Sequence, residues 1–269
     1  PLLRQVAQAR DKGASSWLNA IPYENQGLVL NKQEFRDALR LRYNMPLSDL
    51  PQTCPCGSSF NVNHALSCKK GGFIAQRHDN VRDFLTILLS KVCHNVQAEP
   101  LLIPLNGEHF DLKSTTTSQD ARLDIKAGGF WQRGVTAFFD VRVSHVNSKS
   151  NQNKTTSSIF KEQEQEKKRK YQQRVLDVEM GSFTPLIFGT NGGMGNESQI
   201  FLKTLAEKLS NKTGQSYSDT ITYIRTRLSF EILKAVITCI RGSRTPFFKN
   251  NEHEFLLDFS INTNLADIR

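Results

Sequence analysis

Two short apolar segments, each carrying one aspartate, place the strongest constraint on how this chain folds. Residues 121–125 and 135–143 are rich in branched and aromatic side chains and are bounded by glycines or polar residues, so both predict strands. Asp124 and Asp140 stand at the ends of these strands. Taken singly, each aspartate predicts a solvated strand end. Asp140, however, interrupts an apolar run, where a charge is costly unless it is paired or binds a metal, so the pair predicts a functional site.

The patterns around this pair predict a mixed α/β fold. Residues 77–92 carry the helical repeat of one buried face, residues 96–105 resemble a strand, residues 159–178 predict a highly charged helix, and residues 184–188 predict a last strand. The expected core is therefore αβββαβ, with a mixed central sheet and helices on its faces. After a turn at the glycine-rich residues 189–195, helices over residues 197–209 and 219–241 are expected to pack on the core.

The charged helix supplies amines that complement the two carboxylates. Lys167 and Lys170 are three residues apart, hence on one face, and Tyr171 adjoins them. Two carboxylates can hold Mg²⁺ or Mn²⁺ while water and a phosphate oxygen fill its other positions, and a lysine then orients the water or stabilises the attacked phosphate. This is the residue set of a metal-dependent phosphodiesterase. The alternative is a solvated helix held by i,i+4 ion pairs.

A second group of metal-binding residue types precedes the core. Cys54, Cys56, His64 and Cys68 lie within fifteen residues, with seven residues between Cys56 and His64 and three between His64 and Cys68. Four such ligands suit tetrahedral Zn²⁺ if a tight turn at Gly57 joins the first two thiolates and a short helix presents the other two ligands. Four protein ligands leave no open position for a reacting water, so the predicted site is structural. The alternative is a loop of reduced thiols.

Composition favours a polyanionic partner. The chain has 35 lysines and arginines against 26 acidic residues, a net charge of +9, and basic side chains gain free energy by releasing counterions from a phosphate backbone. Cys93 and Cys239 make the cysteine total odd, which argues against a disulfide framework. No membrane-spanning stretch or signal peptide is predicted. Composition therefore fits a nuclear or cytosolic nucleic-acid protein with no membrane partner, and it does not distinguish DNA from RNA.

The aspartate pair, the Lys167 to Tyr171 helix and the Cys/His segment together resemble a known family. The arrangement is similar to the C-terminal region of non-LTR retrotransposon proteins, in which a CCHC zinc knuckle precedes a restriction-like PD-(D/E)xK endonuclease. The family's first aspartate usually follows a proline, where this chain has Leu123, and Arg142 replaces the lysine found two residues after the second acid. In the retrotransposon branch a lysine from the following helix serves instead, which points to Lys167 or Lys170.

The resemblance implies a function and a set of site residues. It implies an endonuclease that nicks double-stranded DNA for target-primed reverse transcription, with Mg²⁺ or Mn²⁺ at Asp124 and Asp140 and Zn²⁺ at the knuckle. The resemblance also implies a reverse transcriptase domain upstream, a nuclear site of action after synthesis in the cytoplasm, and element RNA as a further candidate partner. The start at Pro1 without a methionine leads us to expect a fragment of a longer protein, and the chain itself carries no polymerase motif. The candidate accessory residues are Arg77, His78, Glu99, Arg142 and Tyr171. Glu99 and Asp111 are the two candidates for a third acidic ligand, although each is more commonly a surface carboxylate. The alternative is a catalytically inactive nucleic-acid-binding module with a degenerate nuclease fold.

We expect four consecutive parts. Residues 1–53 form a helical linker, 54–70 the zinc knuckle, 71–246 the endonuclease domain and 247–269 a tail that is disordered or foreign to the domain. In the linker, Asn31 and Glu34 resemble a capping box that opens a helix through Arg42. Arg36, Arg40 and Arg42 on this helix either contact a phosphate backbone or form a solvated face, and the second role is the more common one.

Overall fold

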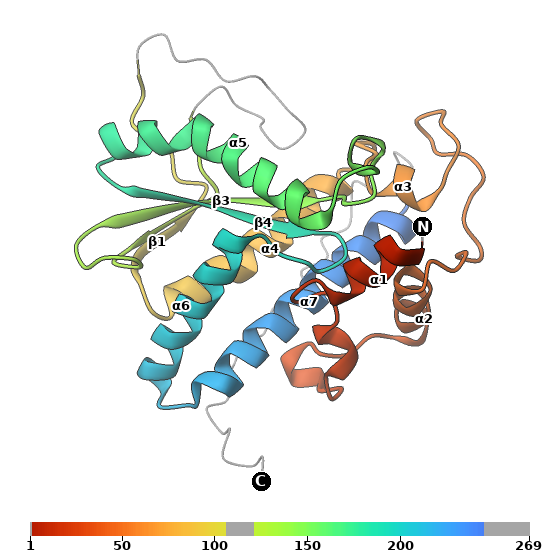
Figure 1. Cartoon of the computed structure of the whole chain (residues 1–269), viewed down its shortest axis with the longest axis horizontal. Helices are drawn as coiled ribbons and strands as arrows, with labels where there is room; N and C mark the ends of the chain where they lie inside the picture. Colours follow the sequence, from red (N-terminus) through yellow and green to blue (C-terminus); the bar gives the residue numbers. More distant parts are fainter. Residues whose placement is uncertain (1, 106–120, 245–269) are drawn as a thin grey trace.

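A four-stranded mixed sheet forms the centre of the molecule. The computed structural model describes residues 2–105 and 121–244, so the predicted tail and Asp111 lie outside the described residues (Figure 1). The strands are β1 (His94–Ala98), β2 (Ile125–Gly128), β3 (Thr136–Ser144) and β4 (Ser182–Gly189). Their order in the sheet is β1-β2-β3-β4, with β1, β2 and β3 antiparallel and with β4 parallel to β3. The predicted mixed α/β class is confirmed.

Seven α-helices accompany the sheet within the described residues. They are α1 (Leu2–Arg10), α2 (Lys32–Arg42), α3 (Val62–Ala65), α4 (Phe73–Ser90), α5 (Thr156–Asp177), α6 (Asn196–Thr213) and α7 (Tyr217–Arg241). The order from α4 through β1, β2, β3 and α5 to β4 is the predicted helix, three strands, helix and strand. The helical repeats and apolar runs therefore predicted the order of these elements, although the bounds of the first two strands differ from the prediction.

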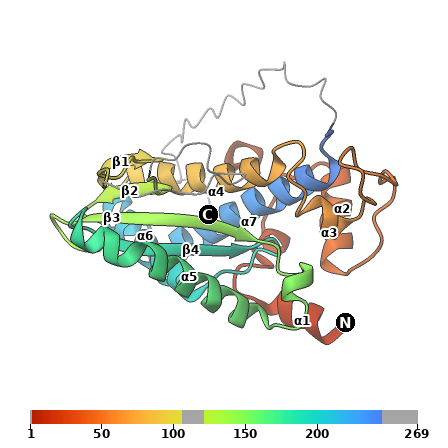
Figure 2. The same ribbon diagram turned by 90° about the horizontal axis from the view of Figure 1, so that it is seen from above.

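The helices cover the two faces of the sheet separately (Figures 1 and 2). Alternate residues of β3 point to opposite faces. Phe139 and Val141 join the main core with residues of α4, α6 and α7, whereas Phe138 packs with Tyr171 and Val175 of α5. Helix α5 therefore lies alone on the face that carries Phe138, and the face that carries Phe139 is buried under α4 and α6, with α7 behind them.

The strand that carries Asp124 begins later than the sequence predicted. The expected strand over residues 121–125 is wrong, because β2 starts at Ile125 and Arg122 makes only an isolated bridge to Leu101. The reason is local. A carboxylate oxygen of Asp124 accepts a hydrogen bond from the Val141 N–H, so a side chain competes with the backbone ladder at this point. Asp124 consequently precedes its strand instead of ending it. The strand predicted over residues 96–105 is also shorter, since β1 ends at Ala98.

The N-terminal helices pack on α7. The predicted capping box is confirmed: the Asn31 side chain accepts from the Gln33 and Glu34 N–H groups, and the Glu34 carboxylate accepts from the Asn31 N–H. Asp37, which is 1% exposed, accepts two hydrogen bonds from the Arg241 guanidinium at 2.7 and 2.8 Å. This bidentate pair and the apolar cluster around Trp17 fix α2 to the end of α7.

Within residues 2–105 and 121–244, no helix combines the length and the apolar character needed to cross a lipid bilayer.

Candidate functional site

Asp124 and Asp140 lie close together on neighbouring segments. The antiparallel register of β2 and β3 begins at the pair Ile125 and Phe139, directly after Asp124 and directly before Asp140. The Asp124 N–H donates to the Phe139 carbonyl at 3.1 Å, so Asp124 lies just outside the regular ladder. The negative charge of Asp124 contributes to raising the pKa of Asp140, after the larger effect of burial, which is consistent with this proximity. The structure thus brings the two predicted carboxylates together.

Helix α5 supplies a cation to Asp140. The Asp140 side chain is buried in the sheet, and its Oδ2 lies 2.7 Å from Lys167 Nζ, an ionic contact that is not a well-directed hydrogen bond. Burial raises the pKa of Asp140, because desolvation penalises the carboxylate, and the charge of Lys167 opposes this effect. The raised pKa shows that Lys167 compensates the buried charge only in part.

The other candidate residues of α5 and β3 occupy the same face. Lys170 Nζ lies 4.7 Å from the centre of the Tyr171 ring, on the exposed side of α5, so it is Lys167 that contacts Asp140. Arg142 points to the face of Asp140, two residues along β3, and donates to Glu166 at 2.8 Å. The spacing of Lys167 and Lys170 placed them on one helix face but did not distinguish between them.

A histidine of α4 contacts the Asp124 carboxylate. His78 of α4 lies with its Nε2 3.1 Å from Asp124 Oδ2 and its Nδ1 3.2 Å from Asp79 Oδ1. Burial lowers the pKa of His78, but its hydrogen bonds to Asp124 and Asp79 outweigh that effect and raise the pKa to about 10. A protonated imidazole therefore faces Asp124 at neutral pH. Among the described residues, the contacts of the Asp124 carboxylate all involve Oδ2. The Oδ1 atom is therefore available to a further ligand.

A divalent cation would complement these charges. The charge of Asp124 disfavours ionisation of Asp140, and a Mg²⁺ or Mn²⁺ ion would relieve this repulsion. Asp124 and Asp140 would hold such an ion, and hard oxygen ligands of this kind leave places for water and a phosphate oxygen. Chemically, the arrangement offers two neighbouring carboxylates flanked by one lysine and one histidinium.

Two of the predicted accessory residues lie elsewhere. The Glu99 carboxylate pairs with Arg82, although the Glu99 N–H donates to the Asp124 carbonyl at 2.8 Å. Arg77, which is 3% exposed, donates to the carbonyls of Leu66 and Val143 at 3.2 and 3.3 Å. Arg77 thus links the Cys/His loop to the end of β3 and does not contact the carboxylate pair in these bonds.

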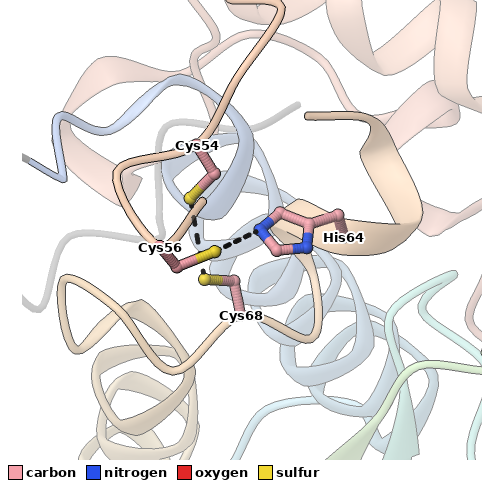
Figure 3. A group of neighbouring side chains, drawn as sticks. All are labelled: Cys54, Cys56, His64 and Cys68. Carbon is pink, nitrogen blue, oxygen red and sulfur yellow. Dashed lines mark hydrogen bonds between the residues drawn. The ribbon is translucent and has the colours of Figure 1, made fainter. Parts of the chain in front are cut away.

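The four predicted zinc ligands converge (Figure 3). Cys54 Sγ lies 3.8 Å from Cys68 Sγ, Cys56 Sγ lies 3.4 Å from His64 Nε2, and all four ligand atoms lie within 4.8 Å of one another. For Zn–S bonds of about 2.3 Å, tetrahedral ligand atoms are about 3.8 Å apart. The separations therefore match a four-coordinate zinc site. Within the described ranges, no other group of three or more Cys, His, Asp or Glu ligands has comparable geometry.

Local turns build this loop. Gly57, with φ of 88°, donates its N–H to the Cys54 carbonyl at 2.8 Å, which closes the turn between the first two thiols. Asn61 caps α3 by accepting from the His64 N–H, and the Cys68 N–H bonds to the His64 carbonyl. Hydrogen bonds from the backbone and side chain of Ser58 lower the pKa of Cys56 to about 6, whereas burial raises the pKa of Cys54. The expected turn is present, and the short helix carries His64, whereas Cys68 follows the end of that helix.

His145 is a half-buried polar residue for which the sequence predicted no role. It follows β3, and its two ring nitrogens lie near the Asn63 and Thr190 side chains. Burial, assisted by the charge of Arg77, lowers the pKa of His145 to about 4 from its ordinary 6.5. A lone histidine after a strand carries no distinguishing signal, so only the tertiary structure identifies it.

This lowered pKa predicts an acid-sensitive contribution to stability. The unfolded chain binds a proton on His145 near pH 6.5 and the folded chain does so only near pH 4, so acid favours unfolding. The contribution is present above pH 6.5 and falls away by up to about 3 kcal/mol as the pH drops toward 4. Urea unfolding of His145→Gln should show a flatter decline between pH 7 and pH 4.5 than unfolding of the unmodified chain. Equal declines would contradict the assignment.

Comparison of the chain with models of known protein families and with curated proteins gives no match.

Proposed function

We propose that this chain is a metal-dependent endonuclease that nicks double-stranded DNA, of the restriction-like PD-(D/E)xK type. One observation carries the proposal: a buried aspartate of a central strand, close to a second aspartate, has a lysine amine at 2.7 Å. Burying a carboxylate is costly, and perturbed carboxylates concentrate at functional sites. The order α4, β1, β2, β3, α5 and β4, which places the pair between two helical layers, supports the same fold assignment.

The Cys/His loop supports a narrower origin. A cluster that could bind zinc stands directly before α4, as the knuckle stands before the nuclease of non-LTR retrotransposon proteins. We therefore propose that the chain is the C-terminal region of such a protein, joined to an upstream reverse transcriptase domain and acting on DNA in the nucleus. The net charge of +9 agrees with a nucleic-acid partner. The nick would provide the 3′ hydroxyl that primes reverse transcription.

The residues divide the chemistry among them. Asp124 and Asp140 would hold the divalent ion, which when bound would activate water and neutralise phosphate charge. His78 orients the Asp124 carboxylate through the 3.1 Å contact between its Nε2 and Asp124 Oδ2. Lys167 lies beside Asp140, where its amine orients the attacking water or stabilises the charge that develops on the phosphate. Arg142 and Lys170, on the exposed side of this face, contact the DNA backbone.

The two lysines of α5 should differ strongly in their effect on cleavage. Lys167→Met removes the amine beside Asp140, and we expect plasmid nicking to slow on the order of 10²-fold, the loss typical for one electrostatic contact in an active site. Lys170→Met removes an exposed cation over Tyr171 and should change the nicking rate only a few-fold. Initial rates of plasmid nicking under single-turnover conditions, with thermal unfolding of both variants measured in parallel, separate the two roles. Equal losses in both variants would contradict the assignment of Lys167.

One observation favours a second function. Lys167 already pairs with Asp140, Glu166 engages Arg142, and Glu99 turns toward Arg82 instead of supplying a third acid. These contacts also suit a catalytically inactive nucleic-acid-binding module in which the nuclease fold is only a scaffold. The two functions separate in one assay, because a scaffold binds DNA in a salt-dependent way without cleaving it.

A further inference from the structure

A large cavity lies away from the carboxylate pair, at the carboxyl ends of the two parallel strands. It has a volume of about 650 Å³, within the range typical of small-molecule sites. Its wall includes residues 145–147, which follow β3, and residues 190–192, which follow β4. In open α/β sheets, ligands commonly bind outside the carboxyl ends of the parallel strands, because loops from neighbouring strands converge there. The position alone therefore favours a ligand site.

Five further parts of the chain complete the wall. They are α1, the segment after it that carries Ala14 and Trp17, the end of α2 with the turn after it, the Cys/His loop around α3, and the middle of α7. Figures 1 and 2 show α2 and α3 near the end of α7, with α1 on the same side of the molecule. The cavity therefore belongs to the junction between the N-terminal helices, the Cys/His loop and the sheet, and it does not include Asp124, Asp140 or Lys167.

The charge of the wall favours an anion. Arg4, Arg40 and Arg42 line the cavity, and no aspartate or glutamate does so in the described part of the chain. The Arg4 guanidinium is occupied by three backbone carbonyls, and Arg40 donates to the Ser48 hydroxyl. For the half-buried Arg42 guanidinium, no hydrogen bond or ion pair occurs among the described residues. A planar guanidinium without a partner suits a phosphate, which accepts two parallel hydrogen bonds from it.

The rest of the wall favours a flat heteroatom-rich group beside that anion. Leu47, Val62 and Ile232 give an apolar floor, and Trp17 contributes an indole. The amide of Asn63 and the hydroxyl of Thr190 lie at the edge, both near His145, whose low pKa keeps it neutral at pH 7. Asn63 Oδ1 and Thr190 Oγ1 already contact His145, but the Asn63 amide N–H groups and the Thr190 hydroxyl can still pair with the edge of a nucleobase, whose faces suit the apolar floor.

We infer that this cavity binds a 5′-phosphorylated nucleoside unit, with the phosphate at Arg42 and Arg40 and the base over the apolar floor. Such a unit has two sources, a free mononucleotide or the phosphorylated 5′ end of a strand. The inference goes beyond the proposed nicking activity, because the cavity excludes the carboxylate pair. It also gives Arg40 and Arg42 a role that their position on α2 alone did not distinguish from a solvated face.

Quenching of Trp17 fluorescence tests the inference directly. The chain has two tryptophans, so Trp131→Phe isolates the Trp17 signal. Titrations without added divalent metal would use adenosine 5′-monophosphate, adenosine, inorganic phosphate, and a deoxyadenosine hexamer with either a 5′ phosphate or a 5′ hydroxyl. We expect saturable quenching by the mononucleotide, or by the phosphorylated hexamer alone. The first result identifies the free nucleotide as a ligand, and the second identifies the strand end.

Matched variants decide whether the cavity is responsible. Arg42→Gln should weaken binding about tenfold or more, the effect of one lost charge-assisted contact, and Arg42→Lys should have an intermediate effect. Arg36→Gln, on an exposed part of the same helix, should leave binding unchanged, and Asp140→Asn should do the same because the cavity is separate from the nicking site. Thermal unfolding would confirm that each variant folds.

Three outcomes would overturn the inference. These are the absence of saturable quenching by both phosphorylated ligands, binding of adenosine or inorganic phosphate as tight as that of the nucleotide, and equal weakening by Arg36→Gln and Arg42→Gln. None of these outcomes depends on cleavage, so failure of the cavity proposal can be distinguished from failure of the proposed nicking activity.

Discussion

Asp140→Asn should abolish metal-dependent DNA cleavage while leaving the fold at least as stable as before. The carboxamide keeps the shape of the side chain but removes the charge that would hold the metal, and we expect a loss on the order of 10³-fold in nicking rate. Asp140 is only 5% exposed, and a buried charge costs free energy that an amide does not. Lys167 remains partly exposed and can stay hydrated when its partner is neutral. Lost cleavage activity with unchanged or raised thermal stability would show that the Asp140 carboxylate serves catalysis and not the stability of the fold.

Glu99→Gln is the matched control for this prediction. Glu99 lies near the Asp124 backbone, but its carboxylate is paired with Arg82 at the surface, so its loss should leave nicking within a few-fold of the unmodified rate. Cleavage of a labelled DNA duplex and thermal unfolding, measured on the same preparations, give both readouts. The assignment of Asp140 is wrong if Asp140→Asn cleaves at the normal rate, or if its stability collapses, which would mark a structural ion pair.

Cys68→Ser should remove bound zinc and unfold the segment before α4. A structural zinc site contributes on the order of 10 kcal/mol of binding free energy that the folded loop depends on. Ala65 and Leu66, between His64 and Cys68, are buried in the main core, so loss of the metal should also lower the unfolding temperature of the rest of the molecule. Metal analysis should find one zinc per unmodified chain and none in the variant, and a strong chelator should reproduce the destabilisation.

Cys93→Ser provides the matched control. Cys93 is a half-buried thiol outside the Cys/His loop, and its replacement should retain one zinc per chain and most of the stability. The prediction fails if the unmodified chain, purified from zinc-containing medium, holds no zinc, or if Cys68→Ser binds zinc as well as Cys93→Ser does.

Local patterns predicted the elements and the zinc ligands well. The buried face of α4, the apolar run of β3 and the capping box at Asn31 are local features, so their residues specify them without long-range information. The same holds for the Cys/His cluster, whose four ligands lie within fifteen residues and are joined by one turn and one short helix. In both cases the chain between the key residues is too short to permit many arrangements.

Long-range contacts account for what the sequence did not predict. Lys167 and Lys170 share a helix face, and only the packing of α5 on the sheet determines that Lys167 meets Asp140. His78 reaches Asp124 across 46 residues of sequence, and Asp37 reaches Arg241 across 204. The late start of β2 depends on a side chain that competes with the ladder, which propensity does not reveal.

Arg77 connects the parts of the proposed enzyme. Its guanidinium donates to Leu66 in the Cys/His loop and to Val143 in the strand that carries Asp140, while the next residue, His78, contacts Asp124. Arg77 thus holds the Cys/His loop against the sheet, and His78 holds a carboxylate. The Cys/His loop and the carboxylate pair are consequently parts of one packed structure.

The central claim is that the carboxylate pair cleaves DNA with a divalent metal, and supercoiled plasmid tests it most directly. The purified chain would be incubated with plasmid in Mg²⁺, in Mn²⁺ and without added divalent metal. We predict that nicked circles form only with metal and carry 3′ hydroxyl ends that a DNA polymerase extends without further treatment. Plasmid that is retarded by the protein but stays supercoiled under every metal condition would contradict the claim and establish the DNA-binding scaffold instead.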